Sequence, residues 1–264
     1  MTPPIVWLDE SLIARVLARL LEPLVAEAGW QLRSRPGLTA AVVRGEPGIA
    51  LLDAFEALAL VPAAFIANDL AVVAQHTSAV ALLTPDRPDR IDRATVLLDA
   101  CRPTSEALAR ATIEPFFGIR PIEWQRSSGS ATGTTVELRV VEDEAALVPP
   151  DERHHDLGRA WFILTGLPFV SHLLVCPPEV SPEGRRTFAR WARELPERLR
   201  ERAAEIASDL AAARPLDAGR LLAYLSDTVD VLSPKARRAL EELLRRSGSR
   251  LRLPDPELYR PLSS

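Results

Sequence analysis

The sequence predicts an α/β protein in which strands alternate with helices and a long helical segment follows the last strand. Three observations support this prediction. Short apolar runs recur along the first 175 residues, segments of helical periodicity separate several of them, and the stretch from 181 to 246 is almost entirely helical in pattern. Because strands that alternate with helices build βαβ units, we expect parallel sheets with the helical tail packed over one face.

The first half of the chain begins with a short apolar run followed by an amphipathic segment. Ile5–Leu8 is typical of a buried first strand, and Ser11–Ala28 carries apolar residues at helical spacing until Gly29, which is expected to end the helix. Further strands are expected at Val42–Val43, Ile49–Leu52, Glu56–Pro62, Ala71–Gln75, Val80–Thr84, Ala94–Leu98 and Ile122–Trp124. We expect Pro85–Arg90 to form a turn and Thr104–Ile113 to form a helix.

The second half begins after a loop-like break at Ser127–Thr134, rich in serine, threonine and glycine. Strands are expected at Val136–Val141 and Phe169–Val175, with a short apolar run at Ala145–Val148 and a helical segment at Asp156–Gly166. The helical tail should divide into three segments, because prolines interrupt it at Pro215 and Pro234.

Composition excludes several classes of protein. A formal net charge of −4 gives no electrostatic footprint for nucleic acid. Lys235 is the only lysine among 32 basic residues and lies at a helix start, which argues against phosphate-loop NTPases and pyridoxal enzymes. No apolar run approaches the roughly 18 residues of a membrane span, and the N-terminus lacks the basic region of a signal peptide. We therefore expect a cytoplasmic protein with no nucleic-acid or membrane partner.

The residues that could carry metal or nucleophile chemistry are few. The four histidines show no paired-ligand spacing, and Cys101 and Cys176 are expected to be buried small side chains, so no metal site is predicted. His154 and His155 are expected in a polar loop. His172 lies within an apolar strand, where it either satisfies the core or lines a site. No GxSxG nucleophile elbow is present.

Thr104 and Ser105 open a helix directly after a buried strand and Pro103. Their hydroxyls could simply cap the helix. The same geometry, with free N–H groups at the positive end of a helix, is also suited to a carboxylate or phosphate, especially at the carboxyl end of a strand. Both interpretations remain open at this point.

Four segments together resemble one known family. They are DLGRAWFILTGLPFV at 156–170, LDACRPTS at 98–105, ALALVP at 57–62 and YLSDTVD at 224–230. Their order and spacing are similar to those of the MqnA/MqnD family, which comprises chorismate dehydratase and cyclic dehypoxanthinylfutalosine-type enzymes of the futalosine route to menaquinone. The last segment resembles the dehydratase branch. The agreement extends from about residue 4 to residue 246.

The resemblance implies a two-lobed fold like that of type 2 periplasmic binding proteins, with a ligand cleft between the lobes. We expect residues 1–94 and about 172–264 in the first lobe, with the C-terminal helices, and about 95–171 in the second. The resemblance also implies a cytoplasmic enzyme that removes water from chorismate, giving 3-[(1-carboxyvinyl)oxy]benzoate, without metal or organic cofactor. A homodimer could form.

The chain departs from the family pattern at segments that face the site. Asp9 stands where the family has an asparagine, and a carboxylate there repels an anionic substrate unless it is paired or protonated. Ala79 replaces a serine, although Ser78 is adjacent, and Pro103 replaces an arginine that is displaced to Arg102. A Gly-Asp pair expected before the Ala145–Pro150 segment is missing.

Two functions from different classes follow from these features. The first is a chorismate dehydratase-like carbon–oxygen lyase; the second is a non-catalytic binding protein for a small carboxylate on the same scaffold. Candidate acid–base groups are Asp9 and His76, with Glu10 beside them. Candidate substrate-binding residues are Ser11, Thr77, Ser78, Thr104, Ser105, Thr165 and Gly166.

Overall fold

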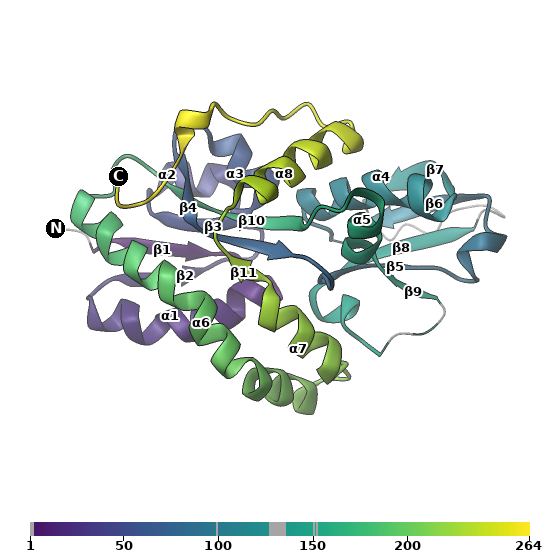
Figure 1. The fold of residues 1–264 in the computed structure, drawn as a ribbon, viewed down its shortest axis with the longest axis horizontal. Helices are drawn as coiled ribbons and strands as arrows, with labels where there is room; N and C mark the ends of the chain where they lie inside the picture. Colours follow the sequence, from purple (N-terminus) through teal and green to yellow (C-terminus); the bar gives the residue numbers. More distant parts are fainter. Residues whose placement is uncertain (1–2, 99, 127–135, 150, 152) are drawn as a thin grey trace.

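The computed structural model describes residues 3–98, 100–126, 136–149, 151 and 153–264, and these form two β-sheets flanked by helices (Figure 1). The first sheet has the order β11-β4-β10-β3-β1-β2, with β12 also paired to β4. Its strands are β1 (Ile5–Leu8), β2 (Gln31–Ser34), β3 (Ile49–Asp53), β4 (Phe65–Ala74), β10 (Phe169–Cys176), β11 (Val229–Asp230) and β12 (Tyr259–Arg260).

The second sheet has the order β7-β6-β8-β5-β9. Its strands are β5 (Val80–Leu83), β6 (Arg93–Leu98), β7 (Arg120–Gln125), β8 (Glu137–Glu142) and β9 (His154–Asp156). The chain passes from the first sheet to the second between β4 and β5, and returns between β9 and β10. The chain therefore crosses between the sheets at earlier residues than the expected lobe boundaries near 94 and 171, because β5 pairs with β8 and β9 and so belongs to the second sheet.

Both sheets are mixed, so the expectation of parallel sheets is wrong. Strand β10 is antiparallel to both β3 and β4, and β5 is antiparallel to β8 and β9, whereas β1, β2 and β3 are parallel. The antiparallel pairs arise where the chain crosses between the sheets, since a strand that returns from the other lobe enters from the opposite end.

Helices cover both faces of the first sheet (Figure 1). On one face, α1 (Leu12–Glu27), α6 (Pro182–Ala213) and α7 (Ala218–Asp227) bury one set of strand side chains, including Val6 and Leu8. On the other, α2 (Ala40–Gly45), α3 (Ala54–Leu60) and α8 (Pro234–Ser247) bury the alternate set, including Ile5 and Trp7. Successive side chains of a strand point to opposite faces, and helices bury both faces of this sheet. Its strands therefore need apolar residues at consecutive positions.

The buried cluster that contains Ile5 and Trp7 continues into the other lobe, where α4 (Pro103–Phe117) and α5 (Leu157–Thr165) pack on the second sheet. Short 3₁₀ turns occur at Pro88–Arg90, Asp143–Ala146 and Pro256–Leu258. Both cysteines are buried, as expected. Among the helices that the structure describes, none is both long and apolar enough to cross a membrane.

Most expected elements are confirmed, and three differ. Residues 42–43 lie in α2. Residues 56–60 lie in α3, because the side chain of Asp53 accepts hydrogen bonds from the backbone N–H groups of Phe55 and Glu56 and starts that helix. A short apolar run cannot by itself distinguish a strand from a buried helix. His154 and His155 belong to β9 rather than to a loop. The expected loop at 127–134 lies outside the described residues.

Candidate functional site

A cavity of about 310 Å³ opens where β1 and β3 end, opposite the loop that follows β6. Because these strand ends and this loop belong to different sheets, the cavity lies between the two lobes. Its charged lining residues are Asp9, Glu10, Asp53, Glu56 and Arg102, and residues 36–39 and 100–103 complete the wall.

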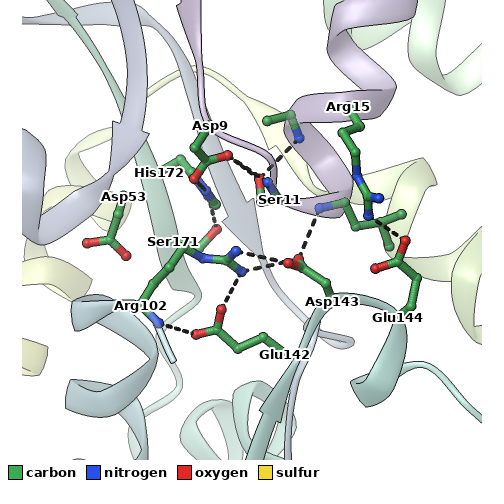
Figure 2. Close-up of polar contacts among 12 residues, drawn as sticks. Asp9, Ser11, Arg15, Asp53, Arg102, Glu142, Asp143, Glu144, Ser171 and His172 are labelled. Carbon is green, nitrogen blue, oxygen red and sulfur yellow. Dashed lines mark hydrogen bonds and ion pairs between the residues drawn. The ribbon is translucent and has the colours of Figure 1, made fainter. Parts of the chain in front are cut away.

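Asp9 lines this cavity and is held by several donors. Its Oδ1 accepts hydrogen bonds from the backbone N and the Oγ of Ser11, at 3.0 and 2.6 Å, and its Oδ2 lies 3.0 Å from Nε2 of His172. The other ring nitrogen of His172 lies 2.9 Å from the hydroxyl of Ser171 (Figure 2). Burial acts to raise the pKa of Asp9, but His172, Arg102 and Ser11 together outweigh it and hold that pKa well below its usual range. Asp9 is therefore ionised at neutral pH.

Asp53 lines the same cavity in a different environment. Its Oδ1 accepts from the hydroxyl of Thr104 at 2.7 Å and from the backbone N of Phe55 at 3.0 Å, and its Oδ2 accepts from the backbone N of Thr104 at 3.2 Å. Complete burial raises the pKa of Asp53, and the hydrogen bonds from Thr104 and the charges of His172 and Arg102 offset this only in part. The pKa values of these two carboxyl groups on one cavity are therefore displaced in opposite directions.

Arg102 is the cation that faces these groups, and it is paired with two acids from the end of β8. Its guanidinium lies 2.8 Å from an oxygen of Glu142 and 2.9 Å from an oxygen of Asp143, and its backbone N donates to Glu142 at 2.7 Å (Figure 2). Burial raises the pKa of Glu142 to about 7, against the opposing effects of Arg102 and a hydrogen bond from Ser105. Glu142 therefore changes charge near neutral pH.

The helix starts at this cavity are capped by carboxylates of the opposite lobe. Asp143, from the second lobe, accepts from the backbone N of Leu12 at the start of α1, at 3.0 Å. Asp53, from the first lobe, accepts from the backbone N of Thr104 at the start of α4. Because helix N-termini attract negative charge, a bound anion would be expected at these positions. The protein's own carboxylates occupy them.

The structure places some of the predicted site residues at this cavity. Asp9, Glu10 and Ser11 line it together. Thr104 and Ser105 lie beside it but are buried, and their hydroxyls donate to Asp53 and Glu142 respectively. From the sequence, this helix start is expected to be either capped by its own hydroxyls or bound to an anion. In the structure it contacts carboxylates, and those carboxylates belong to the chain itself.

Other predicted residues lie elsewhere. His76 and Thr77 line a second cavity that shares no lining residue with the first. Ser78 is buried, where its hydroxyl donates to Asp156 at 2.9 Å or to the carbonyl of Val80 at 3.1 Å, so it joins the two chain segments that cross between the lobes.

Thr165 and Gly166 end α5 and do not line the first cavity. The hydroxyl of Thr165 donates to the carbonyl of Trp161 at 2.8 Å, and Gly166 has the left-handed φ of 69° that a helix C-cap favours. These contacts account for both residues structurally.

Sequence reasoning missed the acidic cap Asp53 and the pair formed by Glu142 and Asp143. A signal existed for Asp53, because an acid that directly follows a buried strand and precedes an apolar segment is typical of a helix cap. Asp143 adopts a left-handed φ of 55°, uncommon for a residue other than glycine. The sequence offered no signal that these acids meet Arg102. In the described part of the chain, no three His, Cys, Asp or Glu side chains are grouped so that they could hold a metal ion.

Comparison with known proteins gives a family match and a fold match. Residues 37–248 match a family model described as menaquinone biosynthesis, and no curated protein matches the chain. Protein AF1704 from Archaeoglobus fulgidus is similar with a TM-score of 0.64 at 15% identity, over 92% of this chain and 96% of that chain. The alkanesulfonate-binding protein SsuA from Xanthomonas axonopodis pv. citri, bound to MOPS, has a TM-score of 0.64 at 13% identity, over 98% and 99%.

The Candida albicans CA3427 gene product, described as having the generic periplasmic binding protein fold, has a TM-score of 0.60 at 8% identity, over 98% of this chain and 93% of that chain. At these identities the likeness shows the fold alone. The chain has a two-lobed, periplasmic-binding-protein-like fold, which confirms the fold class expected from its sequence.

Proposed function

Because the chain belongs to the menaquinone biosynthesis family, we propose that it is a chorismate dehydratase-like carbon–oxygen lyase of that pathway. The supporting observation is that Asp9 and Asp53, with pKa values displaced in opposite directions, line one cavity between the lobes. Removal of water from a ring requires a base and an acid in one place, and carboxyl groups in contrasting environments can supply both roles.

The proposed step uses these two groups in turn. A ring C–H bond breaks and its proton goes to the carboxylate of Asp9, while the electron pair forms a new ring double bond. The neighbouring C–O bond breaks, and the departing hydroxide takes the proton of Asp53 and leaves as water. His172 contacts Asp9 rather than the cavity, so it acts as a positioning residue. His76 has no role in this proposal, because it lines the other cavity.

Arg102 is the proposed contact for a substrate carboxylate. Its guanidinium lines the cavity and is shared with Glu142 and Asp143. Because the pKa of Glu142 is about 7, this carboxyl group can take a proton near neutral pH and release part of the arginine for a ligand. An arginine that pairs with a planar carboxylate gives both energy and orientation.

A binding protein for a small carboxylate is the second candidate, and one observation favours it. The helix starts that would otherwise hold a dianionic substrate are already capped by Asp53 and Asp143. A cavity with this many acids can accept a singly charged ligand on Arg102 more readily than chorismate, whose two carboxylates would both need partners.

One experiment distinguishes the two functions. Purified protein is incubated with chorismate, the loss of its diene absorbance is followed, and the product is identified by mass spectrometry. The lyase predicts 3-[(1-carboxyvinyl)oxy]benzoate, with large losses of rate in Asp9→Ala and Asp53→Asn and none in Glu22→Gln, an exposed carboxylate on α1. If chorismate persists but raises the melting temperature, the binding protein is supported. If neither happens, chorismate is the wrong ligand.

A further inference from the structure

A second cavity, of about 450 Å³, lies between the end of α4, the helix α5 and the strand β9. It shares no lining residue with the cavity beside Asp9. One part of its wall is polar, with His154, Arg159 and Arg220, and another is apolar, with Phe116, Phe117 and Ile163. Neither the family match nor the proposed lyase gives it a role.

His154 presents a buried donor that lacks a partner. Its Nδ1 lies 3.2 Å from the guanidinium of Arg220, which can only donate, so Nδ1 is the acceptor and the ring proton belongs on Nε2. Burial and the neighbouring Arg220 lower the pKa of His154, which agrees with a neutral ring. Its Nε2 is buried and finds no hydrogen-bond partner among the described residues, and the residue as a whole is only 8% exposed. A buried N–H without an acceptor is costly, and a ligand oxygen would satisfy it.

Arg159 adds a positive charge to the same wall. It is exposed on α5, and within the part of the chain that the structure describes its guanidinium has no carboxylate partner. The one acid on the wall, Asp156, is already engaged: its oxygens accept from the backbone N and the hydroxyl of Ser78 and from the backbone N of Arg159. The polar part therefore offers donors and positive charge to an oxyanion.

The apolar part of the wall is exposed to an unusual degree. Phe116 is 37% exposed and Ile163 is 61% exposed. Phe117 lies against the ring of His155, with ring centroids 5.3 Å apart, so an aromatic surface continues toward the polar part. Large exposed apolar side chains beside a charged group are typical of a binding site for a ligand that has an apolar body and one charged end.

We propose that this cavity is a binding site for a small aromatic carboxylate. The carboxylate contacts Arg159 and the Nε2–H of His154, and the ring lies against Phe116 and Ile163. The proposal does not depend on the lyase, because it uses none of the groups assigned to that reaction.

The four histidines of the chain make the test specific, since His76, His154 and His155 line this cavity while His172 contacts Asp9. Imidazole ¹⁵N–¹H correlation spectra are recorded on the full-length protein during titration with benzoate and, separately, with inorganic phosphate. We expect benzoate to shift the His154 signals saturably and to leave those of His172 unchanged.

Two exposed substitutions carry the proposal further. Arg159→Gln should weaken benzoate binding by about 10-fold or more, the effect expected on removing a hydrogen bond to a charged group. Ile163→Ser should weaken it by several-fold, whereas Arg186→Gln, an exposed arginine on α6, should have no effect. Binding that shifts only His172, that is indifferent to Arg159→Gln, or that is as tight for phosphate as for benzoate would overturn the proposal.

Discussion

The pH dependence of Glu142 gives a direct test of the electrostatics at the cavity between the lobes. Burial raises the pKa of this carboxyl group from 4.5 to about 7 in the folded chain. A group whose pKa is higher in the folded state stabilises the fold fully below its unfolded pKa, and this contribution is lost as the pH rises through the folded value. The window for Glu142 is therefore from about pH 4.5 to about pH 7, and the shift corresponds to about 3 kcal/mol.

The substitution Glu142→Gln isolates this contribution, because glutamine resembles the protonated side chain and does not titrate. The free energy of unfolding of the wild type minus that of the variant should fall by about 3 kcal/mol between about pH 4.5 and about pH 8. His154 and His155, whose pKa values are lowered by burial, act in the opposite direction within this window, but they are present in both proteins and cancel in the difference.

Urea unfolding followed by tryptophan fluorescence at a series of pH values measures this difference. Glu137→Gln, which changes an exposed acid on the same strand, serves as the matched control and should give no such trend. A wild-type-minus-variant difference that stays constant across the window would refute the assignment of a raised pKa to Glu142, and with it the proposal that this group releases Arg102 near neutral pH.

Two further predictions concern contacts between the lobes and between the segments that join them. Asp143→Ala removes the acceptor of the Leu12 backbone N–H at the start of α1 and a partner of Arg102, so the free energy of unfolding should fall by about 2 kcal/mol. Asp209→Ala, on the exposed side of α6, should change it by less than about 0.5 kcal/mol; urea unfolding measures both. Gly158→Ala places a Cβ 2.5 Å from the Cβ of Ser78, and this overpacking should cost about 1–3 kcal/mol and lower the melting temperature. Gly45→Ala is the control, because its added Cβ meets nothing within 4 Å. Equal melting temperatures for the two variants would contradict this reasoning.

The pattern of apolar residues was sufficient to predict most helices and strands. The spacing in α1, the helix stop at Gly29 and the interruptions at Pro215 and Pro234 are local features, and the structure follows them. The pattern could not decide between strand and helix at Glu56–Pro62, because so short an apolar run fits either form. There, the cap supplied by Asp53 decided the outcome.

The site itself depended on the tertiary structure. Asp9 and His172 are 163 residues apart in the sequence, and Arg102 and Asp143 are 41 residues apart, so no local spacing predicts either contact. The sequence alone determined that Asp9 would be a carboxylate facing a cleft that the family resemblance implies, and that such a group needs a partner. The tertiary structure decided which partner it has, because antiparallel pairing brings β10 back beside β3 and places His172 within reach of Asp9. It also decided the direction in which the pKa of each acid is displaced, since burial and the position of Arg102 exist only once the two lobes are assembled.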